Sequence, residues 1–109
     1  MAEADADVIE MLKALSNEYR LRVLQWLRDS EANFEPQGEG IYDQSVLKGG
    51  VCVGSIQRKL GLSQSTASNY MSQLQRAGLV IAERHGKWTY YRRNEDAIAR
   101  LREFVEKEL

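Results

Sequence analysis

The side chains best suited to chemistry in this sequence are short polar groups spaced to share one face of a helix. They are Gln64, Ser65, Ser68, Asn69 and Ser72, and Thr66 in the same helix is a further candidate. Their amides and hydroxyls donate and accept hydrogen bonds, and they have a length suited to base edges in the major groove of DNA. The face carries no charge, whereas a helix face that only meets solvent more often carries Glu and Lys pairs. The pattern predicts a helix that reads DNA, with an ordinary polar surface helix as the alternative.

Local signals at both ends define the helix that would carry this face. Ser63 can cap its first turn and Gly78 can end it, so we expect a helix over about residues 64–77. The opposite face would pack on the body through Ala67, Tyr70, Met71, Leu74 and Ala77. The tripeptide 61–63 suits the tight turn of a helix-turn-helix, after a short strand-like start at residue 51 and a helix to about residue 60.

Two β-prone runs, LVIAER and KWTYYRRN, follow the polar helix and are joined around His85-Gly86. Such a pair predicts a hairpin, which beside a helix-turn-helix is a wing. Strand alternation places Trp88 and Tyr90 on one side of it. Its basic side chains, expected to be available to phosphates or to the minor groove, are Arg84, His85, Lys87, Arg92 and Arg93.

The charge of the chain is divided unevenly, although the net charge is only −1. Residues 1–50 carry five Lys and Arg against ten Asp and Glu, and residues 95–109 have a balance of −2. Residues 51–94 carry seven cations against one acid. This basic segment coincides with the polar helix and the hairpin, as a phosphate-binding surface should.

Two apolar helices are expected before the basic segment. The first, over about residues 5–14, carries the stripe Val8, Met11, Leu12 and Leu15. The second can begin at Ser16 or Asn17, and its stripe is too broad for a surface helix, so we expect it in the core. That stripe is Leu21, Val23, Leu24, Trp26 and Leu27.

The last fifteen residues, 95–109, predict an amphipathic helix. Its stripe consists of Ala97, Ile98, Leu101, Phe104, Val105 and Leu109. A terminal helix of this kind either closes its own core or pairs with another subunit, and the sequence leaves both open. For pairing, the predicted dimer interface is Val8, Leu12, Ile98, Leu101 and Val105.

Residues 29–50 form a long connection that contains the only proline and four of the eight glycines. Connections of this length are usually functional or disordered. The apolar side chains that can fold back on the body or across a partner are Phe34, Ile41, Tyr42, Val46 and Leu47. A mobile insert with one helical turn near residues 43–47 and an effector pocket both remain open, and the many turn formers favour the first.

The composition suits one domain over residues 1–109, because 43% of the residues are hydrophobic and 28% are charged. A single cysteine excludes an internal disulfide, and no apolar run approaches the 18 or so residues of a membrane span. The start, MAEADADVIE, lacks the basic beginning and apolar centre of a signal peptide. We expect a reduced, cytoplasmic setting.

Three segments together resemble the arsenic-repressor (ArsR) family of winged-helix transcriptional regulators. They are LKALSNEYRLRVLQWL (12–27), SQSTASNYMSQLQRAGLV (63–80) and ERHGKWTYYRRN (83–94). The resemblance implies a mainly α fold with a β-hairpin wing. It also implies a homodimeric repressor built on the first and last helices and bound to an inverted-repeat operator in double-stranded DNA. By position, Gln64, Ser65, Ser68 and Asn69 match the family's base-facing residues, and residues 84–87 match the wing tip. Tyr70 departs from the family, which commonly has histidine there.

The family's metal-sensing members carry a Cys-x-Cys pair at the start of the third helix. Cys52 matches the first cysteine, but Gly54 occupies the second position, and no histidine follows His85. One thiolate does not supply the three or four soft ligands of such sites, so we expect no metal and no cofactor. Cys52 is interpreted as a small buried hydrophobe, with a redox-sensing thiol as the alternative.

Other functional classes fit the inventory less well. One histidine, one cysteine and no Gly-rich phosphate loop argue against an enzyme. A winged-helix module for protein contacts is the stronger rival, yet such a module has no need to gather cations around an uncharged polar face. We therefore expect a DNA-binding regulator without the family's usual metal ligands.

Overall fold

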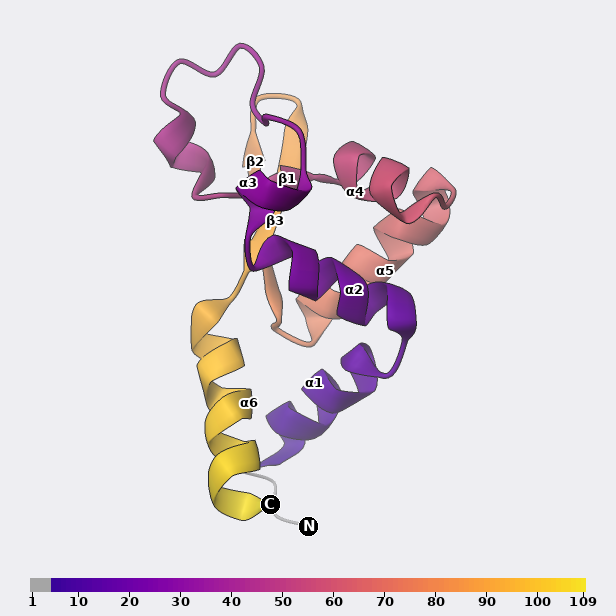
Figure 1. Ribbon diagram of the computed structural model, residues 1–109, viewed down its shortest axis with the longest axis vertical. Helices are drawn as coiled ribbons and strands as arrows, with labels where there is room; N and C mark the ends of the chain where they lie inside the picture. The colour runs from indigo at the N-terminus through magenta and orange to yellow at the C-terminus, as the bar shows by residue number, and fades with distance from the viewer. Residues whose placement is uncertain (1–4) are drawn as a thin grey trace.

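Six α-helices and a three-stranded sheet make up residues 5–109, the part of the chain that the computed structural model describes (Figure 1). In chain order they are α1 (Ala6–Leu15), α2 (Glu18–Leu27), α3 (Ser30–Asn33), the 3-10 helix η2 (Gln44–Leu47), β1 (Val51–Cys52), α4 (Val53–Leu60), α5 (Gln64–Arg76), β2 (Val80–His85), β3 (Trp88–Arg93) and α6 (Glu95–Glu108). The predicted class, mainly α with a hairpin wing, is confirmed. The expectation about a signal peptide concerns in part residues 1–4, which lie outside the described residues.

Side-chain caps explain where the central helices begin. Asn17, one of the two predicted caps of α2, accepts hydrogen bonds from the backbone N–H groups of Tyr19 and Arg20 at 2.9 and 3.1 Å. Ser63 caps α5 by accepting from the Thr66 N–H at 3.2 Å. Gly61, in the turn between α4 and α5, has the positive φ of +71° that the sequence predicted. The helix-turn-helix is therefore defined by local signals.

The sheet runs in the order β1-β3-β2 with antiparallel pairing throughout. His85 pairs with Trp88 across the two-residue turn of the hairpin, where Gly86 has a φ of +64°. Val51 of β1 pairs with Tyr91, so β1 joins the wing to the start of α4. The predicted wing is thereby tied to the helix-turn-helix through a backbone ladder.

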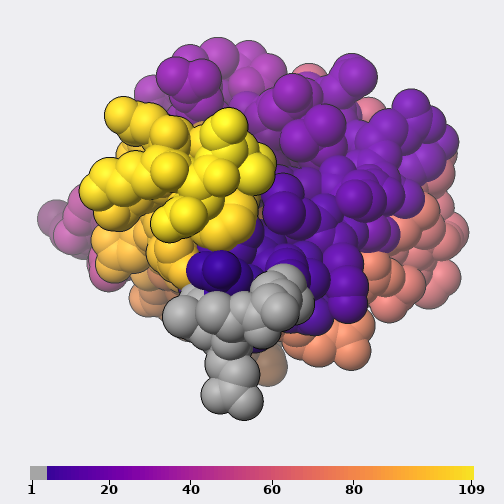
Figure 2. Space-filling model, turned by 90° about the horizontal axis from the view of Figure 1, so that it is seen from below, coloured from indigo at the N-terminus to yellow at the C-terminus, as the bar shows by residue number. Residues whose placement is uncertain are grey.

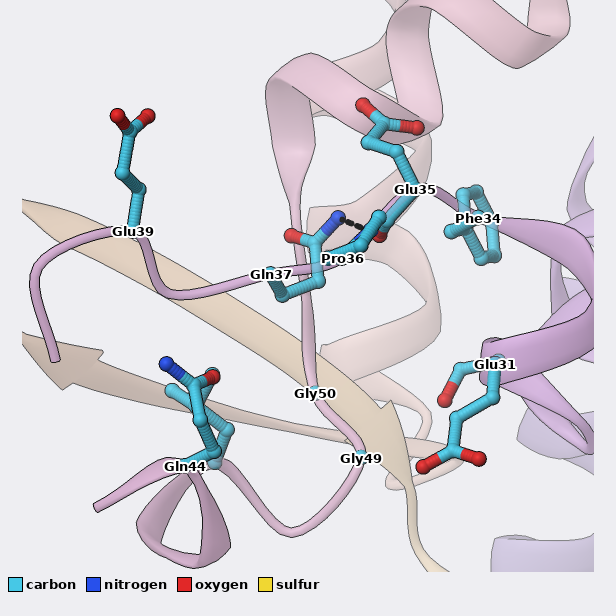
Figure 3. A pocket seen from close by; sticks show the side chains of 11 residues that line it. Glu31, Phe34, Glu35, Pro36, Gln37, Glu39, Gln44, Gly49 and Gly50 are labelled. Carbon is cyan, nitrogen blue, oxygen red and sulfur yellow. Dashed lines mark hydrogen bonds between the residues drawn. The ribbon is translucent and has the colours of Figure 1, made fainter. Parts of the chain in front are cut away.

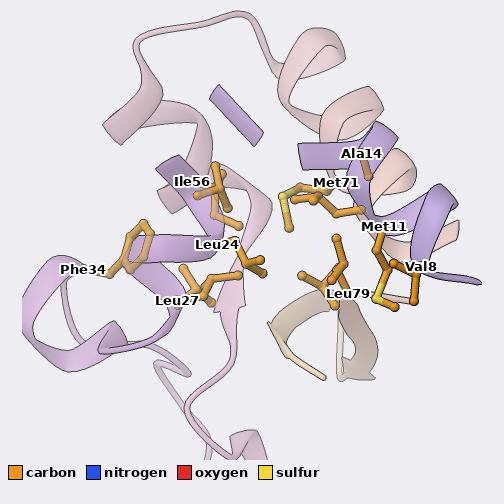
Figure 4. Close-up of a cluster of buried hydrophobic side chains, with 13 residues drawn as sticks. Val8, Met11, Ala14, Leu24, Leu27, Phe34, Ile56, Met71 and Leu79 are labelled. Carbon is orange, nitrogen blue, oxygen red and sulfur yellow. The ribbon is translucent and has the colours of Figure 1, made fainter. Parts of the chain in front are cut away.

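The core lies where α1, α2, α4 and α5 meet the inner side of the sheet (Figure 4). Its largest fully buried side chains are Val8, Val23, Val51, Ile56, Met71, Leu74 and Leu79. The expectation that the whole stripe of α2 is buried is wrong for Leu21, which is exposed. An α-helix turns about 100° per residue, so the six-residue spacing between Leu21 and Leu27 places them on different faces.

The two ends of the described chain meet, since α6 runs beside α1 (Figures 1 and 2). Arg100 of α6 donates to the Asp7 carboxylate at 3.1 and 3.3 Å and lies 3.6 Å from Asp5. Several side chains of α6 pack against the edge of the core, but none of its residues is buried. The outer parts of α1 and α6 thus form an open surface at one end of the molecule.

Part of the 29–50 connection packs on the body of the domain. Phe34 and Leu47 are buried, and the predicted helical turn is present as η2. Tyr42 is fully exposed and does not fold back on this chain, and Val46 is 38% exposed. The short α3, begun by Asp29, was not predicted because four residues are too few to show a helical period.

Candidate nucleic-acid interface

Helix α5 divides into the two faces that its sequence predicts. Ala67, Met71 and Leu74 are fully buried against the body. On the other face Gln64, Ser65, Asn69 and Ser72 are exposed, while Thr66 and Ser68 are half-buried. The exposed amides and hydroxyls project from a rigid helix, which is the arrangement needed to reach base edges in a groove.

A group of three side chains holds α5 against α2. The rings of Tyr70 and Tyr19 stack with centroids 5.9 Å apart and planes 15° from parallel. The guanidinium of Arg20 lies 5.5 Å from the centre of the Tyr70 ring, and its Nε donates to the backbone carbonyl of Ala14 at 2.5 Å. Tyr70, which stands where the resembled family commonly has histidine, therefore packs α5 against α2.

The hydroxyls in the first turn of α5 bond largely to one another. Ser63 donates to Thr66 Oγ1 at 2.9 Å, and its Oγ lies 3.3 Å from that of Ser65. Thr66 is thus occupied in the cap, which leaves Gln64, Asn69 and Ser72 as the freest donors and acceptors on this face.

The wing separates its basic residues into two kinds. Arg84 and Lys87 are exposed beside the turn, where Arg84 Nε donates to the Gly86 carbonyl at 3.0 Å. Arg92 donates to Glu83 at 2.5 Å, and Arg93 is held by Glu95 at 2.9 Å; their side chains are 20% and 14% exposed. The hydrogen bond from Arg92 lowers the pKa of Glu83 below its ordinary value. The prediction that Arg92 and Arg93 are available to phosphates is wrong. Both guanidinium groups are largely buried and form ion pairs with the carboxylates of Glu83 and Glu95.

His85 and Trp88 lie opposite each other at the end of the hairpin. The His85 ring is half-buried, with its Nε2 atom 3.2 Å from Glu83 and its centroid 6.0 Å from that of Tyr90. The indole of Trp88 is 62% exposed. The sequence predicts Trp88 on the wing but does not indicate it as part of the DNA interface. Its position next to the turn, far from the core, could have indicated that its indole is exposed.

Cys52 lies half-buried where β1 joins α4. Its Sγ atom is 3.4 Å from the hydroxyl of Ser55, and its N–H donates to Gln37 Oε1 at 3.0 Å. Within residues 5–109, no three His, Cys, Asp or Glu side chains gather closely enough to hold a metal ion. Across the same residues, no helix combines the length and apolar character needed to cross a membrane.

The predicted dimer residues fall into two groups. Leu12 and Val105 are 43% and 47% exposed on α1 and α6, and Ile98 and Leu101 are half-buried at the same end of the molecule. Val8 has no exposed surface and must be removed from the prediction, because its position on α1 faces α5 and the core rather than solvent. The exposed apolar side chains of α1 and α6, Leu12 and Val105, are not covered by other parts of residues 5–109.

Known proteins resemble this chain over nearly its whole length. Residues 44–82 match the family model described as bacterial regulatory protein, arsR family. The chain is 52% identical over 101 residues to YbzH of Bacillus subtilis, an uncharacterized HTH-type transcriptional regulator, covering 93% of this chain and 97% of that protein. It is 30% identical to the transcriptional activator HlyU of Vibrio cholerae, covering 84% of this chain and 67% of that protein. Among solved structures, the homodimeric winged helix-turn-helix domain of Mycobacterium bovis Mb0332, a possible ArsR-family transcriptional regulator, has a TM-score of 0.64 and 28% identity, covering 97% of this chain and 84% of that one.

Proposed function

Because this chain belongs to the ArsR family of bacterial regulatory proteins, we propose that it is a homodimeric repressor that binds an inverted-repeat operator in double-stranded DNA. Its fold and relatives are those of DNA-binding transcriptional regulators rather than of enzymes. A role on DNA places the protein in the cytoplasm with its operator. Since HlyU is named an activator, the direction of regulation receives its own test below.

The observation that carries this proposal is the uncharged polar face of α5, which points outward while Ala67, Met71 and Leu74 on the other face are fully buried. In the proposed complex Gln64, Asn69 and Ser72 meet base edges in the major groove, and Ser65 and Ser68 lie at the margin of the contact. Arg84 and Lys87 of the wing meet phosphates, which fix the position of the protein without reading sequence. Each group of side chains thus has a separate energetic role.

A dimer gives this contact its symmetry. Two subunits joined through the exposed apolar surface of α1 and α6 would present two copies of α5, which for successive major grooves must lie about 34–36 Å apart. The homodimeric state of the Mycobacterium bovis neighbour supports this arrangement. The same two-fold symmetry predicts a palindromic site.

Selection of bound sequences from a random double-stranded DNA pool tests the proposal directly. We expect enrichment of an inverted repeat whose half-sites are about one helical turn apart. A pool without enrichment after repeated rounds, or one enriched in a single half-site, contradicts it. A reporter gene placed behind the selected site then gives the direction of regulation, because a repressor lowers its expression and an activator raises it.

Two alternatives are separated by the same assays. A winged-helix module for protein contacts would show no preference among DNA sequences. A redox-responsive repressor would lose operator affinity after mild peroxide treatment, and Cys52→Ser would abolish that loss. The thiol of Cys52 is half-buried and lies in contact with the Ser55 hydroxyl.

A further inference from the structure

The 29–50 segment borders a cavity of about 690 Å³ that is open to solvent on one side and lies beside α3 and the start of β1 (Figure 3). Its walls include Phe34 and Pro36 on one side, Leu47 and Gln44 on another, and the bare backbone of Gly49 and Gly50. Pockets that hold small organic ligands usually measure roughly 300–1,000 Å³ and combine apolar walls with a few polar groups. The size and the lining both match that description.

The chemistry of the lining selects the charge of a ligand. The walls contain the carboxylates of Glu31, Glu35 and Glu39 but no Lys, Arg or His side chain. Glu35 is neutralised by Arg58, which lies outside the cavity. Glu31 has no ion-pair partner among residues 5–109 and extends from α3 toward Gly49 and Gly50, whereas Glu39 points away (Figure 3). At its open side the cavity therefore has one unpaired carboxylate, that of the exposed Glu31, beside apolar walls.

One wall of the cavity is bonded directly to the helix-turn-helix. This wall, residues 34–37, is called the strap. Glu35 accepts hydrogen bonds from Arg58 and from the Ser55 hydroxyl, the latter at 2.7 Å. Gln37 donates to the Ser55 hydroxyl at 3.0 Å and accepts from the Cys52 N–H at 3.0 Å. Ser55 is only 2% exposed, so the strap satisfies a buried hydroxyl at the first turn of α4.

From these contacts we propose that the cavity binds a small organic cation, an amine attached to an apolar body, and that its occupancy is coupled to the position of α4. The ammonium group pairs with Glu31, and the apolar body lies against Phe34, Pro36 and Leu47. A ligand acts on a distant site only if it favours one of two arrangements of the protein. The strap provides that link, because it contacts the ligand on one side and Ser55 on the other, and α4 packs on α5.

Binding to the cavity does not depend on the proposed function, so it is tested without DNA. Three amines serve as probes: 2-phenylethylamine, cyclohexylmethylamine and isoamylamine. The neutral control is 2-phenylethanol and the anionic control is 3-phenylpropionate. In ¹⁵N NMR spectra of the full chain we expect saturable shifts of the Gly49, Gly50 and Glu31 amide signals with at least one amine. That amine should bind at least about tenfold more tightly than its neutral analogue, a preference of about 1.4 kcal/mol.

Two matched variants assign the preference for a cation. Glu31→Gln should reduce the amine to the affinity of the alcohol, whereas Glu39→Gln should retain the wild-type difference. Unchanged signals from the core confirm that both variants are folded. Three results would overturn the proposed site. The first is equal binding of amine and alcohol by the wild type, and the second is that the saturable shifts lie only elsewhere in the protein. The third result is that no amine saturates at about 10 mM, a concentration some tenfold above a millimolar Kd.

The coupling rests on the proposed function and uses the operator obtained by selection. A saturating amine should change the operator Kd of the wild type at least about fivefold, within the usual range of allosteric coupling. Gln37→Ala, which removes the bonds of the strap to Ser55 of α4 and to Cys52 of β1, should abolish that change, while Glu39→Gln should preserve it. An unchanged Kd in the wild type overturns the coupling. A wild type that selects no DNA overturns the proposed function instead and leaves the NMR result standing.

Discussion

Helices α5 and α6 have similar lengths and similar amphipathic sequences, yet one is complete within the monomer and the other is not. Helix α5 is capped by Ser63, and it buries Ala67, Met71 and Leu74 entirely. Helix α6 is also capped, by Asn94, but buries no residue and leaves Val105 about half exposed. An apolar stripe therefore predicts that one face of a helix will be buried. It does not predict whether that face packs on the core of its own chain or on another subunit.

Removing a core side chain from α5 should produce the largest effect. Leu74→Ala deletes a fully buried side chain and should lower the free energy of unfolding by about 2–5 kcal/mol. Urea unfolding at a fixed, low protein concentration measures the loss. Val105→Ala is the matched change on α6 and should cost the monomer under about 1 kcal/mol. Equal losses would remove the difference between the two helices.

Placing a charge on the inner stripe of α6 should disrupt subunit pairing. Leu101→Asp should yield monomers whose operator affinity is at least about tenfold weaker, a loss of roughly 1.4 kcal/mol or more. Sedimentation gives the assembly state, and a gel-shift titration gives the affinity. Arg102→Asp introduces the same residue at an exposed position and should leave both unchanged. A wild-type protein that sediments as a monomer at micromolar concentration contradicts the dimer.

Substitutions on the outer face of α5 and on the wing should affect different properties of DNA binding, the preference for one sequence and the affinity for any DNA. Asn69→Ala should reduce preference for the selected operator by about 1–3 kcal/mol, because one set of base contacts is lost. Arg84→Ala should weaken binding to all DNA alike and flatten its dependence on salt. Fluorescence anisotropy with operator and scrambled duplexes at two salt concentrations distinguishes these results. Wild-type binding by both variants would exclude α5 and the wing as the interface.

The strap should contribute a smaller, pH-dependent stabilisation. Hydrogen bonds from Arg58 and Ser55 lower the pKa of Glu35 from 4.5 to about 2. A carboxyl whose folded-state pKa is lowered stabilises the protein above its unfolded pKa, and that contribution is lost as the pH falls from about 4.5 to 2. Glu35→Gln should lower stability at pH 7 by under about 1 kcal/mol, since the carboxylate is half exposed. A difference from wild type that persists unchanged at pH 2 would exclude the ion pair as its cause.

Soft metals should have no effect on DNA binding. Stoichiometric zinc, cadmium or arsenite under reducing conditions should leave operator affinity unchanged, because Cys52 lacks the companion thiolates that soft metals require. A DNA-binding titration with and without each metal is the measurement. A tenfold loss of affinity at one metal per subunit or per dimer would reveal a site built from other residues.

Local sequence signals predicted the elements that are defined locally. The cap at Ser63, the turn at Gly61 and the hairpin at Gly86 each depend on one or two residues and their immediate neighbours. The α5 face followed from helical periodicity, which needs only regular spacing. These features account for most of the fold and for the reading surface.

Contacts between distant segments were not predictable in the same way. The pairing of Arg92 with Glu83 depends on hairpin register, and that of Glu35 with Arg58 joins segments 23 residues apart in the chain. Val8 and Leu12 share one stripe, but only the packing of α1 against its neighbours decides which is buried. The strap was likewise not predicted, since nothing in the local sequence indicates that Glu35 and Gln37 bond to the buried hydroxyl of Ser55.

The bond between Arg100 and Asp7 has a consequence for the order in which the chain folds. It joins residues 93 positions apart, so α1 has no α6 to lie against until residue 100 has left the ribosome. At synthesis rates of about 5–20 residues per second, the interval between the two helices lasts roughly 5–20 seconds. During it α2, α4, α5 and the wing can assemble while α1 lacks one of its neighbours. The surface proposed to join two subunits is thus absent throughout this interval and forms only after α6 has been made.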